Sequence, residues 1–194
     1  MRIIAGRFRG RALASVGKGD SAAHLRPTTD RVRESLFNVL AHRHELQGAR
    51  VLDLFAGTGA LGLEALSRGA AHVTFVDDGR VAGQLIRKNV DLTDSRADTD
   101  FIRRDAARLG PCPGEACDLV FLDPPYGKAL GQRALSAATQ GGWVAPDALI
   151  VWEENATMPA PEGFELIDSR KYGDTHITLM QNSGDKSDPD ASAR

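Results

Sequence analysis

The chain has 194 residues, a length that suits one domain with a full hydrophobic core. Cys112 and Cys117 are too few for a zinc site or a disulfide framework, and no apolar run reaches the roughly twenty residues of a membrane span. The first 50 residues carry ten Lys or Arg and four acids (net +6), whereas the remainder carries 14 and 22 (net −8). A basic segment on an acidic body predicts a polyanionic partner, although scattered solvated arginines would give the same count. We expect a cytoplasmic monomer without a metal or a membrane segment.

The amino-terminal 46 residues form the first of three predicted units. Residues 2–16 combine alternating apolar positions with turn glycines, which predicts a short β-hairpin. After a flexible link at 17–21, a helix is expected with Thr28 or Thr29 as its N-cap, because apolar residues recur there at helical spacing. These residues are Val32, Leu36, Val39 and Leu40. On the approach to the helix or on its other faces lie Arg26, Arg31 and Arg33.

From residue 47 to 182 the pattern changes to alternating strands and helices, which is typical of a parallel α/β sheet. The predicted strands are Arg50–Phe55, His72–Asp77, Asp100–Arg103, Asp118–Leu122 and Ala148–Glu153. Helices are predicted at Ala60–Arg68, Gly79–Asp91 and Ala129–Thr139, and a final strand pair at Phe164–Lys171 and Thr175–Gln181. Residues 183–194 are polar without an apolar anchor, so a disordered tail is expected.

A glycine loop follows the first of these strands. Gly57 to Gly62 reads GTGALG, opens a helix, and is followed at the end of the next strand by Asp77, as in a dinucleotide-binding fingerprint. Asp53 argues against NAD, because a pyrophosphate in this crevice would meet a carboxylate in low dielectric. S-adenosylmethionine has no phosphate and carries two cationic groups, so an acid beside the loop favours it. Asp77 would accept the ribose hydroxyls, and Asp105 either contacts the adenine amine or caps a short turn.

The stretch VFLDPPY places Asp123 at the end of a buried strand, followed by Pro124, Pro125 and Tyr126. Each proline fixes its own φ, lacks an N–H and restrains the residue before it. A rigid carboxylate, the Pro124 carbonyl and an aromatic ring at a strand end suit work on the amine of a nucleobase. A simple Pro-Pro turn after a strand is the alternative interpretation.

Several motifs in this order resemble the RsmD family of bacterial 16S rRNA (guanine(966)-N(2))-methyltransferases. The matching stretches are MRIIAGRFRGRAL, LRPTTDRVRESLFNVL, VLDLFAGTGALGLEALSRGA, LVFLDPPY and KYGDT. The resemblance implies a Rossmann-like methyltransferase with a seven-stranded, mostly parallel sheet whose last strand is antiparallel. It also implies S-adenosylmethionine as cofactor, and 16S rRNA within the small ribosomal subunit or its assembly intermediate as partner. Gly79 stands where the family tends to have a second acid, and Asp78 is expected to compensate.

The expected roles can be collected into three sets. The catalytic set is Asp123, Pro124, Pro125 and Tyr126. The cofactor set is Asp53, Phe55, Gly57, Thr58, Gly59, Asp77, Asp78, Asp105 and Ala106. The substrate set is Arg7, Arg9, Arg11, Arg26, Thr28, Arg31 and Arg33. Three other functions remain open from the residues alone: a DNA adenine-amine methyltransferase, an NAD-dependent oxidoreductase, and a non-catalytic RNA-binding assembly factor.

Overall fold

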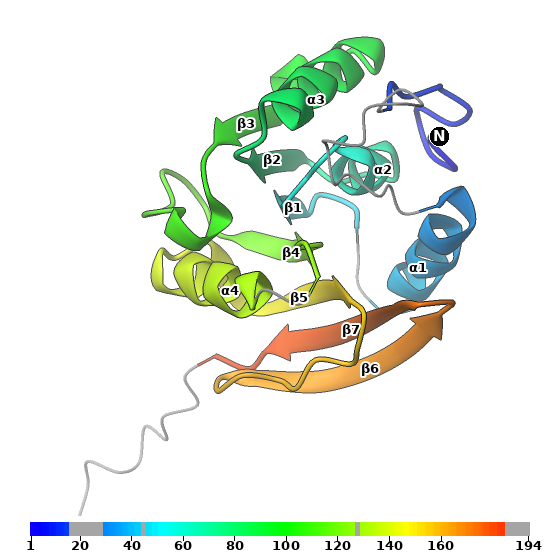
Figure 1. Ribbon diagram of the computed structural model, residues 1–194. Coiled ribbons are helices and arrows are strands. Elements are labelled where there is room, and N and C mark those ends of the chain that lie inside the picture. Colours follow the sequence, from blue (N-terminus) through cyan, green and yellow to red (C-terminus); the bar gives the residue numbers. More distant parts are fainter. Residues whose placement is uncertain (16–28, 44–45, 127–128, 185–194) are drawn as a thin grey trace, which may run out of the picture.

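A computed structural model describes residues 1–15, 29–43, 46–126 and 129–184, so Arg26, Thr28 and the predicted tail at 185–194 lie outside the described residues. A seven-stranded sheet in the order β3-β2-β1-β4-β5-β7-β6 forms the centre of the molecule (Figure 1). The strands are β1 (Arg50–Leu54), β2 (His72–Asp77), β3 (Thr99–Arg103), β4 (Cys117–Leu122), β5 (Val144–Glu154), β6 (Phe164–Tyr172) and β7 (Thr175–Asn182). The helices are α1 (Asp30–Arg43), α2 (Ala60–Ser67), α3 (Arg80–Leu92) and α4 (Leu130–Gln140), with short 3₁₀ turns η1 (Arg96–Asp98) and η2 (Ala106–Arg108).

The strand directions confirm the predicted fold class. Strands β1 to β5 pair in parallel, whereas β7 pairs antiparallel with both β5 and β6. The predicted boundaries of the strands and of α2, α3 and α4 agree with the structure within one residue, except at the start of β5. That strand begins four residues early, and its register with β4 shifts between Cys117 and Leu119. The irregular stretch contains Pro146 and a left-handed Asp147 (φ 60°), which hide the early part of the strand from its sequence pattern.

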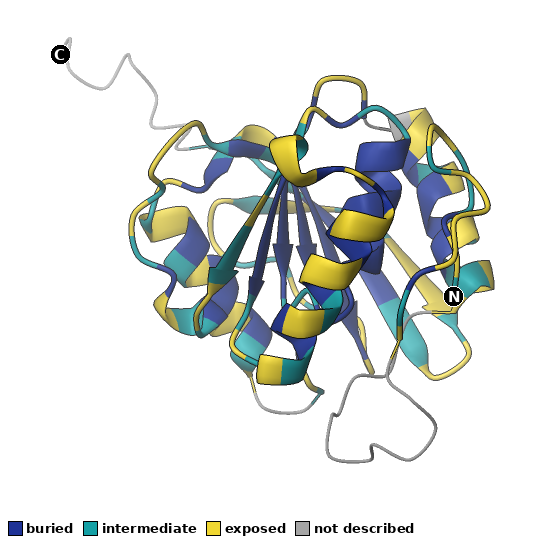
Figure 2. Cartoon of the chain, turned by 90° about the horizontal axis from the view of Figure 1, so that it is seen from above, coloured by how far each residue is buried: buried dark blue, intermediate teal, exposed yellow. Residues whose placement is uncertain are grey.

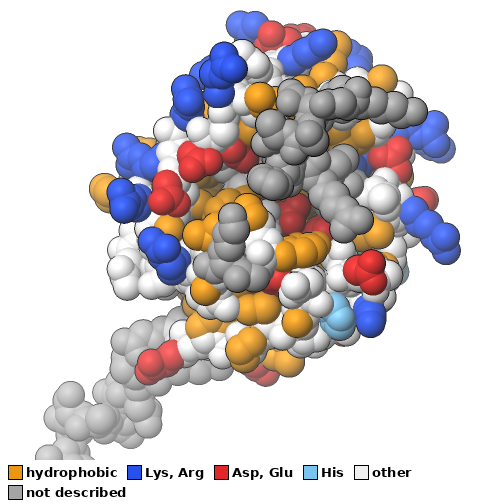
Figure 3. Space-filling model, in the orientation of Figure 1, with side chains coloured by type: hydrophobic (Ala, Val, Ile, Leu, Met, Phe, Trp, Pro, Cys, Tyr) orange, Lys and Arg blue, Asp and Glu red, His pale blue; other side chains and the backbone are white. Residues whose placement is uncertain are grey.

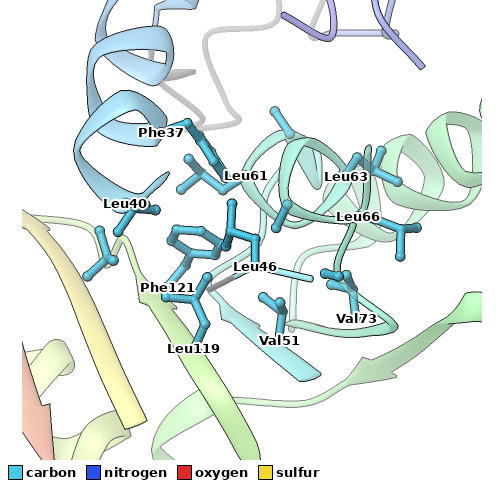
Figure 4. Packing of buried hydrophobic residues seen from close by; sticks show 14 of the residues in the cluster. Phe37, Leu40, Leu46, Val51, Leu61, Leu63, Leu66, Val73, Leu119 and Phe121 are labelled. Carbon is cyan, nitrogen blue, oxygen red and sulfur yellow. The ribbon is translucent and has the colours of Figure 1, made fainter. Parts of the chain in front are cut away.

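Two hydrophobic clusters cover the two faces of the sheet. Side chains of α1, α2 and α3 pack on one face and those of α4 on the other, and Figure 2 shows the buried strands between helices with exposed outer surfaces. On the first face, Phe37 of α1 lies over Phe121 of β4 with ring centroids 5.8 Å apart. Figure 4 shows Phe37 and Leu40 of α1 facing Leu61 of α2 and the strands beneath. Helix α1 is therefore part of the same core as the sheet.

Thr29 caps α1, because its Oγ1 accepts a hydrogen bond from the N–H of Val32 at 3.3 Å. Leu36 and Leu40 are buried as predicted, but Arg33 is also completely buried. Its guanidinium donates to the Arg2 carbonyl and to Asp30, and lies 3.7 Å from Glu64 of α2. This corrects the expectation that Arg33 lies on a polar helix face. The physical reason is that its charge pairs with Asp30 of the same helix and with the buried Glu64 of α2, and that one nitrogen also donates to the Arg2 carbonyl. Among the described residues its Nε and Nη1 atoms have no hydrogen-bond partner.

Residues 1–15, here called the arm, form one antiparallel bridge between Arg2 and Ala12, within the range of the predicted short hairpin. Ile3 and Leu13 anchor the arm in the core. The buried carboxylate of Glu64 accepts hydrogen bonds from the N–H groups of Ile4 (2.8 Å) and Ala5 (3.1 Å). The arm is thus attached to α2, the helix that follows the glycine loop. Within the described residues, no helix is long and apolar enough to cross a membrane.

Candidate functional site

Three strand-end carboxylates lie on the same face of the sheet. Asp53 pairs in register with Phe75 of β2 and with Phe121 of β4. Because side chains alternate along a strand, Asp77 and Asp123 each lie two residues further along this face. The parallel strands end together, so all three acids gather at the carboxyl edge of β2, β1 and β4. Ligands of open α/β sheets bind at this edge.

The glycine loop places the start of α2 directly over this edge. Gly59 precedes the helix with φ 76°, a left-handed conformation that favours glycine. A Cβ at Gly62 would lie 2.5 Å from the Phe75 ring and 2.6 Å from a Val73 methyl group. Helix α2 can therefore approach β2 closely only because this position lacks a side chain, as the sequence predicted for the loop.

Asp53 is almost fully buried beneath the first turn of α2. Its Oδ2 accepts a hydrogen bond from the N–H of Gly62 at 3.0 Å, so this acid also serves the helix amino terminus. Burial raises the pKa of Asp53 to about 8; the hydrogen bond from Gly62 opposes the shift and the charge of Asp77 adds to it. A buried carboxylate of this kind gains most from a cationic ligand, which would favour its ionised form.

Asp77 ties the glycine loop to the beginning of α3. One carboxylate oxygen accepts from the N–H of Gly57 at 2.9 Å and the other from the N–H of Gly79 at 2.8 Å. Burial raises the pKa of Asp77, while these two hydrogen bonds lower it and the charge of Asp78 raises it further. Each oxygen retains a lone pair that can accept a ribose hydroxyl.

These contacts test which cofactor the loop suits. In a dinucleotide site, the N–H groups of the glycine loop and helix start bind pyrophosphate. Here the N–H groups of Gly57 and Gly62 donate to carboxylates of the protein itself. A phosphate would have to displace two acids and then face their charge. The loop therefore fits a phosphate-free, cationic ligand with ribose hydroxyls and does not fit NAD.

The remaining predicted cofactor contacts surround this loop. Phe55 follows β1 in a left-handed conformation (φ 59°), which is strained for a bulky residue. Thr58 is buried, whereas Asp78 is exposed. The Asp105 side chain caps η2 by accepting a hydrogen bond from the N–H of Ala107 at 2.9 Å. Within the protein, Asp105 therefore acts as the cap of a short turn, which is the second of its two predicted roles. Ala106 is buried within that turn.

Asp123 follows β4 and is half-buried, with Pro124 buried and Pro125 exposed behind it. Burial raises the pKa of Asp123 well above its usual value, and the charges of Glu153, Asp53 and Glu154 raise it further, in that order. Asp123 lies one strand from Asp53, so a group bound at Asp123 would be beside the glycine-loop ligand.

Tyr126 closes the side of the site toward β7. Its hydroxyl donates to Oε1 of Glu153 at 3.3 Å and lies 3.1 Å from Oγ1 of Thr175. Burial raises the pKa of Tyr126 to about 12, so the hydroxyl stays protonated at neutral pH. The predicted ring is present, and its hydroxyl has partners that sequence reasoning did not identify.

Sequence reasoning also missed Asn89 of α3. This fully buried side chain donates to the Thr58 carbonyl (2.8 Å) and exchanges two hydrogen bonds with the backbone of Ala14 (2.7 and 3.0 Å). Asn89 therefore connects the arm directly to the glycine loop. The available signal in the sequence was an Asn at a position on the apolar face of an amphipathic helix.

Two exposed arginines of the arm contact the end of α3 and the η1 turn that follows it, whereas Arg31 belongs to α1. Arg7 pairs with Asp98 at 2.8 Å and Arg11 donates to the Leu92 carbonyl, while Arg9 and Arg31 are exposed. Figure 3 shows acidic and hydrophobic side chains near the centre of one face and Lys and Arg mostly around its rim. This face therefore combines an acidic centre with a mostly cationic rim.

The fold and the loop define an α/β methyltransferase. A putative methyltransferase from Escherichia coli has a solved structure that superposes with a TM-score of 0.81 at 37% identity, covering 95% of this chain and 98% of that one. A putative methylase from Haemophilus influenzae gives a TM-score of 0.75 at 34% identity, covering 94% and 98%.

The family follows from the sequence comparisons. A family model described as "Conserved hypothetical protein 95" matches residues 1–181, and the chain belongs to this family. A relative from Escherichia coli named "Ribosomal RNA small subunit methyltransferase D" is 38% identical, over 93% of this chain and 89% of that protein. A "Putative rRNA methyltransferase YlbH" from Bacillus subtilis is 35% identical, over 95% and 100%. The RsmD resemblance of the motifs is thereby confirmed, and the protein is a methyltransferase.

Proposed function

We propose that this protein transfers a methyl group from S-adenosylmethionine to the N2 amine of a guanine in small-subunit ribosomal RNA. The names of its relatives support the rRNA substrate. The observation that carries the donor assignment is the pair of glycine-loop N–H groups bonded to Asp77 and Asp53, which leaves an edge suited to a cation. When bound, S-adenosylmethionine supplies an electrophilic methyl group on a sulfonium.

On the acceptor side, Asp123 and the Pro124 carbonyl accept hydrogen bonds from the two hydrogens of the guanine amine. An aryl amine is a weak nucleophile because its lone pair is delocalised into the ring. Holding both hydrogens turns the lone pair toward the methyl group, so most of the acceleration comes from orientation and electrostatics. The methyl group would pass from the sulfonium to the amine nitrogen, the C–S electron pair would remain on sulfur, and the amine proton would leave to a carboxylate or to water.

The base must leave its stack to reach a site at the edge of the sheet. Tyr126 offers a half-buried ring for the extruded base, and the exposed arginines Arg7, Arg9, Arg11 and Arg31 offer charges for phosphates. Arg33 is excluded from this set because it is buried and paired with Asp30 and Glu64. The donor site and the polyanion surface meet at α2, where Glu64 holds the arm.

The test supplies isotopically labelled S-adenosylmethionine to small subunits from cells that lack the enzyme, with deproteinised 16S rRNA in parallel. Nucleoside analysis identifies the labelled base, and the Asp123→Ala protein serves as the matched control. We expect label in N2-methylguanosine. Label in N6-methyladenosine would support an adenine-amine methyltransferase, and RNA binding without any label would support a non-catalytic assembly factor.

A further inference from the structure

Glu153 lies beside Asp123, although in the sequence it was only the last residue of a predicted strand and had no predicted role. Leu122 of β4 pairs with Trp152 of β5, so Asp123 and Glu153 are the next residues on adjacent parallel strands. Alternation along β5 places Val151 in the core cluster under α1 and α2, and Glu153 on that same face. The side chain is 8% exposed. A second carboxylate therefore lies at the acceptor side of the site.

The orientation of Glu153 is fixed by the wall of the site. Tyr126, three residues after Asp123, donates its hydroxyl to Oε1 of Glu153 at 3.3 Å, and Thr175 of β7 lies 3.1 Å from that hydroxyl. The neighbouring Glu154 lies on the opposite face by alternation, and its Oε2 accepts the N–H of Asn155. The side chains of the two adjacent buried glutamates therefore lie on opposite faces of the sheet.

The edge of the base supplies the chemical reason for a second acid. Guanine presents an N1–H donor beside its N2 amine, whereas adenine presents an unprotonated N1 acceptor beside its N6 amine. A carboxylate next to the amine-binding group can accept the guanine N1–H but would face the adenine N1 lone pair. We propose that Glu153 is the specificity-determining residue that accepts the N1–H of the target guanine, an inference that rests on the proposed function.

The electrostatics of the pair agree with this role. Apart from burial, the charge of Glu153 is the strongest influence raising the pKa of Asp123. Two close carboxylates repel each other when both are ionised. A guanine edge brings three hydrogen-bond donors, the N1–H and the two N2 hydrogens, which stabilise a charged pair. An adenine edge brings two donors and one acceptor, so it relieves less of the repulsion.

The test compares guanine with 2-aminopurine, which keeps the C2 amine but has an unprotonated N1. A ligated 16S rRNA carries either base at the mapped methylation position, is reconstituted into small subunits, and is used to measure kcat/KM. We expect wild type to favour guanine by at least about a hundredfold, because a site built for a hydrogen bond rejects an analogue that lacks the donor. Glu153→Gln should narrow this preference by at least about tenfold.

The glutamine variant separates recognition from a structural role. Its amide oxygen can still accept the Tyr126 hydroxyl, while its NH₂ group can donate to the N1 of 2-aminopurine. The intrinsic reactivities of the two amines cancel when the wild-type and variant ratios are compared. Glu154→Gln is the matched control and should keep the wild-type ratio. Thermal melting and S-adenosylmethionine binding confirm that each variant is folded.

Three results would overturn the inference while leaving the proposed function intact: the same ratio in wild type and Glu153→Gln, an equal narrowing in Glu154→Gln, or a wild-type ratio near one. The last of these results is measured on the wild-type protein alone, so the inference can be tested even if a variant folds poorly. If wild type fails to methylate guanine at all, the proposed function fails and the inference fails with it.

Discussion

Single carboxylates dominate the site, and each has a distinct environment. Asp53 is buried under α2, Asp77 is held by two backbone N–H groups, and Asp123 lies next to another acid at the end of β4. In the proposed function, the first two would hold a cation and its ribose, while the third would accept the hydrogens of an amine. Substitutions of Asp53 or Asp77 should therefore weaken binding of the methyl donor, whereas substitution of Asp123 should lower the rate of methyl transfer.

Asp123 should act mainly in the transition state, because the amine lone pair develops toward the methyl group only there. We expect Asp123→Ala to lower methyl transfer at least roughly a hundredfold, about 2.7 kcal/mol, with affinities for S-adenosylmethionine and RNA changed by less than about threefold. Asp123→Asn should be intermediate, since its amide oxygen still accepts one hydrogen. Single-turnover rates and equilibrium binding measure the two effects, and normal turnover in a folded Asp123→Ala protein would refute the mechanism.

Asp53 should make the stability of the protein depend on pH. Its pKa rises from 3.8 to about 8 on folding, so between these values the folded protein holds a proton that the unfolded chain has lost. Stability attributable to this group therefore falls as pH rises toward 8. The side chain of Asp53→Asn cannot titrate. The free energy of unfolding of this variant, relative to that of wild type, should therefore increase from pH 6 to pH 8. Urea unfolding at both pH values measures the difference, and a difference that does not change with pH would contradict the assignment.

At the scale of elements, the arm and α2 are joined more tightly than their separation in sequence suggests. Glu64 accepts two arm N–H groups, Arg68 donates to it at 2.8 Å, and Asn89 connects Ala14 to the glycine loop. Cationic side chains are thus presented on a backbone that is fixed to the cofactor loop. RNA contacts made by the arm would be transmitted to the site through these hydrogen bonds.

The arm arginines should contribute to the salt dependence of RNA binding. We expect combined replacement of Arg7, Arg9 and Arg11 by Gln to weaken RNA binding and to reduce the slope of log K against log salt by roughly 0.7–0.9 per lost phosphate contact. Arg133→Gln, an exposed position on α4 on the other face of the sheet, is the control for a general charge effect. Binding isotherms at several salt concentrations supply the slopes, and a wild-type slope in the triple variant would show that the arm does not contact phosphate.

At the scale of the whole molecule, residues 1–46 and 47–182, predicted as two units, contribute side chains to one hydrophobic cluster. Ile3 and Leu13 of the arm, with Phe37 of α1, belong to the same buried cluster as Val51 and Phe121 of the sheet. A unit that shares its core with its neighbour cannot unfold without exposing that neighbour.

We therefore expect one cooperative unfolding transition for the entire chain, with coincident loss of secondary structure and tertiary packing. Differential scanning calorimetry and circular dichroism measure the two signals. A separate early transition that releases residues 1–46, detected by limited proteolysis before the main transition, would show that the arm and α1 form an independent unit.

The sequence by itself determined the features that depend on nearby residues. Strand and helix periodicity, the glycine loop, and the acids Asp53, Asp77 and Asp123 at strand ends could all be identified, because each of these signals is a pattern within a short stretch of sequence. Thr29 as the cap of α1 belongs to the same group, since its hydrogen bond spans three residues.

Only the tertiary structure decided which distant groups meet. Glu153 is beside Asp123 because β5 pairs with β4 in a particular register, and a bulge in that pairing is invisible to periodicity. Arg33 turns inward because Glu64 of α2 and the Arg2 carbonyl of the arm meet it beside Asp30 of its own helix. The burial of a charge depends on whether partners are available in space, and that availability is set by strand order and side-chain packing, which no local pattern encodes.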